Sequence, residues 1–130
     1  MILVKQKEVH ECALACLVMV IGQDYEYVRS RLPDGARKSL DIGEGMFTDE
    51  MLLTLEEFDI VWDYSKEACV TDEDTYILTV PSKNAEGRLH SVVYHHGKVY
   101  DPSTRIQYTD PSEALQKTRG YLLCYKEFPD

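Results

Sequence analysis

The stretch KQKEVHECALACLVMVIG, residues 5–22, places a cysteine at the start of a run of small and large apolar residues. This composition predicts a helix from Cys12 to Ile21, and Gly22 is typical of a helix end. Cys12 would lie in the first turn, where unpaired backbone N–H groups and the helix dipole favour a negative charge. A thiol in that position has a lowered pKa and is a usable nucleophile. Cys16, one turn deeper, is expected to pack in the core.

Length and charge restrict the class of protein. A chain of 130 residues suits one domain, which we expect over residues 1–130. The net charge of −9 argues against a nucleic-acid partner, because phosphate binding needs a basic surface. An acidic surface favours basic or neutral partners, or serves solubility alone.

Neither an export signal nor an apolar run long enough to span a bilayer is visible, which predicts a cytoplasmic protein with free thiols. A structural zinc site needs paired clusters of ligands, and His10, Cys12 and Cys16 have no second cluster downstream. We therefore expect no metal and no cofactor.

The order of the predicted elements indicates the fold class. Helices are expected at residues 25–32 with Asp24 as N-cap, after Thr48 as N-cap, and from Asp110 to about Lys117. Residues 35–45 carry three glycines and are expected to form a loop. β-branched and aromatic residues predict strands at 59–64, 75–80, 90–95, 98–101 and 121–126. Helices followed by strands at hairpin spacing predict an α+β fold with a mostly antiparallel sheet.

A thiolate nucleophile needs a base, and His90, at the start of a predicted strand, is the best placed histidine. If His96 and Gly97 form a two-residue hairpin loop, residue 93 pairs with 100 and residue 92 with 101. Asp101 then shares a face with His90 and lies within reach to orient its ring. A shift of one residue would move Asp101 to the opposite face.

Gln6 lies just upstream of the predicted helix. Its side-chain amide can donate hydrogen bonds, and together with the backbone N–H of Cys12 it would hold a developing oxyanion. Gln6, Cys12, His90 and Asp101 are therefore the candidate site residues.

These residues carry a family resemblance. The pattern QKEVHECALACLVMVIG followed by HSVVYHHGKVYDPS resembles the bacteriocin-processing cysteine peptidases, which are papain-like domains that remove double-glycine leader peptides and are usually fused to ABC exporters. Glu11 stands where that family usually has Asp, and Ala13 where it usually has Gly. The resemblance spans residues 6–102. It implies a papain-like fold, with an N-terminal helical half packed on a C-terminal sheet, and a peptidase domain without fused transporter segments.

The resemblance also implies a function. The chain would be a cysteine endopeptidase that cleaves a peptide or protein substrate after small residues such as Gly-Gly, and it would associate with an exporter or another partner protein. Two alternatives stay open. The same residues would serve amide hydrolysis or acyl transfer on another substrate, and a catalytically weak or inactive papain-like module would only dock a peptide or protein partner.

Overall fold

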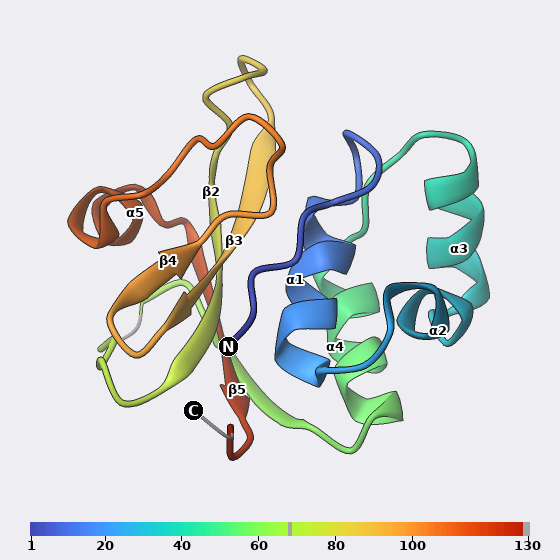
Figure 1. Cartoon of the computed structure of the whole chain (residues 1–130), viewed down its shortest axis with the longest axis horizontal. Helices are drawn as coiled ribbons and strands as arrows, with labels where there is room; N and C mark the ends of the chain where they lie inside the picture. The colour runs from blue at the N-terminus through green and yellow to red at the C-terminus, as the bar shows by residue number, and fades with distance from the viewer. Residues whose placement is uncertain (68, 129–130) are drawn as a thin grey trace.

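The computed structural model describes residues 1–67 and 69–128, in which helices precede a sheet (Figure 1). The helices are α1 (Cys12–Ile21), α2 (Tyr25–Ser30), α3 (Asp34–Asp41), α4 (Thr48–Glu57) and α5 (Pro111–Lys117). The strands are β1 (Val61–Ser65), β2 (Thr75–Pro81), β3 (Leu89–His95), β4 (Lys98–Tyr100) and β5 (Gly120–Tyr125). α1 to α4 all precede β1, which confirms the predicted α+β class.

The sheet has the strand order β1-β5-β2-β3-β4, and every pairing is antiparallel. β3 and β4 are joined by His96 and Gly97, whose φ angles of 49° and 79° are those of a type I′ turn. Val93 pairs with Tyr100 and His95 with Lys98. The predicted two-residue loop and its register are therefore confirmed.

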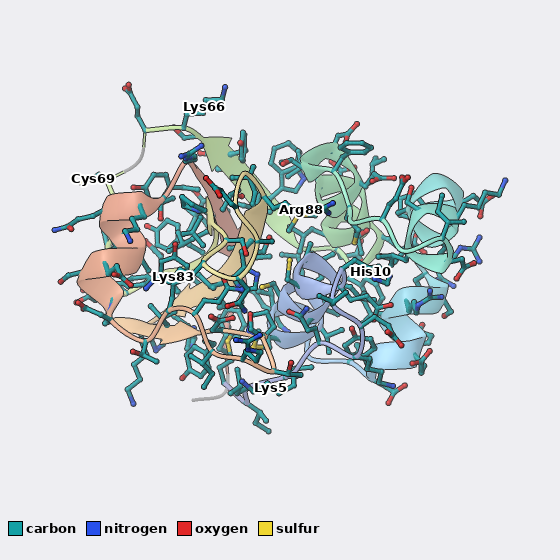
Figure 2. All side chains as sticks on the ribbon, turned by 90° about the horizontal axis from the view of Figure 1, so that it is seen from above. Lys5, His10, Lys66, Cys69, Lys83 and Arg88 are labelled. Atoms are coloured by element: carbon teal, nitrogen blue, oxygen red, sulfur yellow. The ribbon has the colours of Figure 1, made fainter. Side chains whose placement is uncertain are left out.

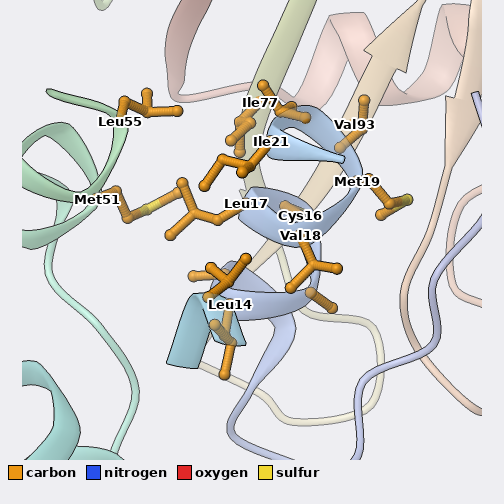
Figure 3. Close-up of a cluster of buried hydrophobic side chains, with 14 of the residues drawn as sticks. Leu14, Cys16, Leu17, Val18, Met19, Ile21, Met51, Leu55, Ile77 and Val93 are labelled. Carbon is orange, nitrogen blue, oxygen red and sulfur yellow. The ribbon is translucent and has the colours of Figure 1, made fainter. Parts of the chain in front are cut away.

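α1 is the central helix of the fold. Every residue from Ala13 to Ile21 is buried, because α1 packs against β3 on one side and against α2 and α4 on the other. In Figure 3, Leu17 lies beside Met51 of α4, and Ile21 lies on the side of Ile77 of the sheet. Burying each large apolar side chain contributes about 1.5–3 kcal/mol. Cys16 is fully buried in this cluster, as predicted.

The other face of the sheet forms a second core. Leu78, Val92 and Tyr94 alternate with the residues that face α1, and they pack with Tyr108 and with Ala114 of α5. α5 lies across the sheet from α1 to α4 (Figure 1). The central strands β2 and β3 are therefore buried on both faces, and the edges and strand ends of the sheet are the places where a cleft can open.

α3 occupies most of the segment that the sequence predicts as a loop, so that prediction is wrong. The three glycines of residues 35–45 obscure the helical pattern, which consists of only two apolar residues. Ala36 and Leu40 are one turn apart, and both are buried against the core. Tertiary burial of this pair outweighs the weak local propensity.

Several predicted boundaries also differ by one or two residues; the helix expected at residues 25–32 ends at Ser30, for example. The N-cap of α4 is Phe47 rather than Thr48, and the carboxylate of Glu50 accepts a hydrogen bond from the Phe47 amide at 2.8 Å. β1 begins at Val61 instead of residue 59, because Asp59 adopts a φ of 58° and turns the chain.

Candidate active site

The start of α1 meets the part of β3 that β4 does not cover. β4 pairs only with residues 93–95 of β3 among the described pairings, which leaves the backbone at the start of β3 open on that edge. The amide of Ser91, on this open edge, donates a hydrogen bond to the sulfur of Cys12. Cys12 therefore reaches the sheet at its open edge. His90 lies on the face of β3 that points away from α1, but at this edge Cys12 can still meet it.

His90 links the thiol to a carboxylate. Its side chain is 5% exposed, and its Nε2 lies 2.7 Å from Asp101 Oδ1 and 2.9 Å from Ser103 Oγ. The other ring nitrogen, Nδ1, is left for the hydrogen bond between His90 and the Cys12 thiol. The structure thus connects a thiol, an imidazole and a carboxylate in the order Cys12, His90 and Asp101, which is the order that the prediction of a nucleophile, a base and an orienting group requires.

Asp101 is held by backbone amides as well as by the imidazole. Oδ1 also accepts from the Ser103 amide at 2.9 Å, and Oδ2 accepts from the amides of Gln107 at 2.8 Å and Tyr108 at 3.0 Å. Burial raises the pKa of the carboxyl, but the hydrogen bond from His90 and these amides outweigh it and hold the pKa well below its usual range. Asp101 is therefore a fixed anion behind the imidazole.

The pKa values of Cys12 and His90 are shifted in opposite directions from their ordinary values, and both shifts favour an ion pair. Burial opposes both charged forms, raising the pKa of the thiol and lowering that of the imidazole. The hydrogen bonds and opposite charges outweigh it, so the pKa of Cys12 is lowered and that of His90 is raised to about 9. The amides of Ser91 and Ala13 also stabilise the thiolate. A thiolate beside an imidazolium is the reactive form of a cysteine nucleophile.

Gln6 lines the same cleft as Cys12 and His90, but its donors are engaged elsewhere. Its Nε2 donates to the carbonyls of Glu8 at 3.0 Å and Val9 at 2.9 Å. Its Oε1 is buried and has no hydrogen-bond partner among the residues that the structure describes. Gln6 therefore holds the loop before α1, and its role as oxyanion donor stays a prediction.

Glu11 anchors the start of α1 to α2. Its side chain is buried, and Oε1 accepts a hydrogen bond of 2.7 Å from the hydroxyl of Tyr25. Arg29 Nε lies 3.8 Å from Oε2, and the Lys7 amide donates to the Tyr25 oxygen at 3.3 Å. This network fixes the residue that immediately precedes Cys12.

Sequence reasoning missed Ser103. Its hydroxyl contacts the ring of His90 and accepts from Gln107 Nε2 at 3.1 Å, so it helps to set the plane of the imidazole. The signal was present in the triplet Asp101-Pro102-Ser103, because an Asp commonly accepts from the amide two residues later.

The histidines without a predicted role have partners of their own. His10 donates from Nε2 to the Leu40 carbonyl at 2.8 Å, and His95 Nδ1 lies 2.6 Å from the Thr75 hydroxyl. All four cysteines are free thiols, and all lie in the described part of the chain. Within residues 1–67 and 69–128, His, Cys, Asp and Glu form no group of three that could hold a metal ion, and no helix is long and apolar enough to cross a membrane.

The cleft lies between the helices and the sheet and has a volume of about 760 Å³. On the helical side it is lined by Ala13 and by the segment before α4, including the exposed side chain of Phe47. On the sheet side it is lined by residues of the loops before β3 and after β4. Cys12 and His90 form its floor, so an extended chain could lie across the thiol.

Comparisons of the chain with protein-family models and with curated proteins return no match. The α+β architecture and the antiparallel sheet are clear from the structure. The geometry of the site is therefore the evidence on which a function can be assigned.

Proposed function

We propose that this protein is a papain-like cysteine peptidase that acts on a peptide or protein substrate. The observation that supports the proposal is the connected set of Cys12, His90 and Asp101 at the floor of a cleft, with the pKa of the thiol lowered and that of the imidazole raised. A helix whose first residue is the cysteine adds unpaired amides beside the sulfur.

In the proposed reaction, the Cys12 thiolate attacks the scissile carbonyl. A C–S bond forms, and the carbonyl electron pair moves to oxygen. The His90 imidazolium then gives its proton to the leaving amine as the C–N bond breaks, which leaves a thioester. Water attacks the thioester while His90 takes a proton from it, and the acid is released with the thiol restored. Asp101 keeps Nδ1 of His90 directed at the sulfur throughout by holding Nε2.

The oxyanion would be held by the backbone N–H of Cys12, because the first amides of a helix have no partner within the helix. Gln6 would contribute only if its amide released one of the carbonyls of Glu8 and Val9 when substrate binds. This arrangement also supports a second candidate, a module that docks a peptide and turns it over slowly or not at all. The buried loop contact of Gln6 is the observation that favours it.

The test is hydrolysis of a peptide library containing Gly-Gly, with cleavage mapped by mass spectrometry and a thiol-reactive probe applied in parallel at neutral pH. We expect cleavage by the wild type and none by Cys12→Ala or His90→Ala. Cys16→Ala is the matched control, because Cys16 is fully buried one turn along the same helix and should leave cleavage intact. Cleavage that persists in Cys12→Ala would overturn the proposal. Binding without cleavage would favour the docking module.

A further inference from the structure

Two arginines without carboxylate partners line the sheet side of the cleft. Arg88 immediately precedes β3, and Arg105 follows β4; both side chains are exposed. In the described part of the chain, no Asp or Glu forms an ion pair with either one. Lys7, the other strongly basic residue of the lining, is already paired with Glu26 at 2.8 Å.

The segments that carry these arginines are tied to each other. Asn84 Nδ2 donates to the Arg105 carbonyl at 3.3 Å, and the Ser82 amide donates to the Arg88 carbonyl at 2.8 Å. The Lys83 amide donates at 2.6 Å to the side chain of Gln107 in the same segment as Arg105. The two backbones therefore form one braced wall, and both arginines belong to the lining of the cleft.

The wall that carries Arg88 and Arg105 is positively charged, whereas the whole chain has a net negative charge. The chain has 23 acidic and 14 basic residues, whereas the lining of the cleft contains Lys7, Arg88 and Arg105 but only Glu8 as an acid. Figure 2 shows Arg88 between the sheet and the helices, while Lys83 lies toward α5. The charge of the whole chain, which favours basic or neutral partners, does not describe this site.

We propose that Arg88 and Arg105 select a peptide substrate with acidic side chains near the scissile bond. This inference rests on the proposed function and adds the substrate class. A guanidinium binds a carboxylate with two parallel hydrogen bonds. An arginine without an acidic partner also attracts anions into a cleft, because the low-dielectric protein around the cleft focuses its electric field. A nucleic acid fits poorly, because the acidic surface outside the cleft would repel its phosphates.

The experiment uses the full chain with Cys12→Ala, so that binding is measured without cleavage. The probes are a pair of fluorescent peptides with a central Gly-Gly, one flanked on both sides by glutamates and the other by glutamines at the same positions. We expect the glutamate peptide to bind about tenfold more tightly in fluorescence anisotropy, with the preference falling as salt is added. The double change Arg88→Glu and Arg105→Glu should remove or reverse the preference. Arg119→Glu is the matched control, because Arg119 is exposed and lies outside the cleft.

Each outcome decides the proposal. Equal binding of the two peptides, binding of neither, or a preference that survives the double change would overturn it. Cleavage by the wild type is measured separately on both peptides. If both are cut at the same rate, the peptidase function stands and the acidic preference is wrong. If the glutamate peptide binds selectively and neither is cut, the acidic preference stands and the peptidase function is wrong.

Discussion

The change Asp101→Asn tests the most highly connected residue of the site. The carboxylate accepts four hydrogen bonds, two on each oxygen, from the His90 ring and from the amides of Ser103, Gln107 and Tyr108. Asparagine offers one oxygen and one NH₂ group. With the NH₂ group at the Oδ2 position, two backbone amides face a group that cannot accept from them. With it at the Oδ1 position, the Ser103 amide is left without an acceptor, whereas a neutral imidazole can turn its Nε2 into an acceptor.

An unsatisfied buried donor costs about 1–3 kcal/mol, so one or two such donors should lower the free energy of unfolding by about 1–6 kcal/mol. Domains of this kind are stable by about 5–15 kcal/mol, and the variant should therefore fold but melt roughly 10 °C lower. The measurement is urea unfolding followed by circular dichroism. Asp63→Asn is the control, because Asp63 is an exposed strand residue. A free energy of unfolding within about 0.5 kcal/mol of the wild type would refute the role of Asp101 as the shared acceptor.

The pH dependence of the site should be sought in reactivity rather than in stability. His90 has a raised pKa, so its contribution to stability is complete below 6.5 and is lost as pH rises through about 9. Cys12 has a lowered pKa, so its contribution grows as pH rises toward its ordinary value of 9.0. The contributions of His90 and Cys12 to stability therefore oppose each other over the same pH range.

Alkylation of Cys12 should persist below neutral pH, and Asp101→Asn should shift the pH profile of alkylation to higher pH. Hydrolysis by the wild type should fall above pH 9, where His90 loses its proton.

Three further predictions concern residues around the nucleophile. Iodoacetamide at pH 7 should label Cys12 before Cys16, because burial raises the pKa of Cys16 well above its ordinary value; equal labelling of the folded protein in peptide mapping would contradict this. Gln6→Ala should lower the free energy of unfolding by about 1–3 kcal/mol, because the Val9 carbonyl loses its donor and the Glu8 carbonyl keeps only the Glu11 amide; an unchanged urea midpoint would show that water replaces the Gln6 amide. Tyr25→Phe should cost about 1–3 kcal/mol, because Glu11 loses the hydroxyl that its buried carboxylate accepts from; a thermal melt that matches the wild type would exclude this anchoring role.

Local signals in the sequence were sufficient for the parts of the site that depend on one helix end and one hairpin. Gly22 ends α1 in a left-handed conformation, which places Cys12 at the other end of the helix. His96 and Gly97 both adopt positive φ, so the hairpin has two loop residues and its register follows from counting. That register leads to the contact between His90 and Asp101, because strand alternation permits few other partners.

Other features depend on contacts between distant segments, which no local pattern encodes. The helix around Ala36 and Leu40 forms because both side chains reach the core. The side-chain amide of Gln6 donates to the carbonyls of residues 8 and 9 because the chain bends back there. The backbone amide of Gln6 donates to the Pro102 carbonyl at 2.9 Å. The basic wall at Arg88 arises only when the loops before β3 and after β4 are hydrogen-bonded together.

Nucleophile activation and oxyanion binding rest on separate parts of the structure. The thiolate is favoured by His90 and by backbone amides, and Asp101 keeps the imidazole in place through contacts that do not involve substrate. Gln6 belongs instead to the loop before α1, where its side-chain amide donates to the carbonyls of Glu8 and Val9. The contacts that favour a thiolate at Cys12 are therefore built into the fold, whereas the proposed oxyanion role of Gln6 would require that loop to rearrange. For this reason a thiol-reactive probe reports on the thiolate of Cys12 alone, and only turnover of a peptide reports on both the thiolate and the oxyanion site.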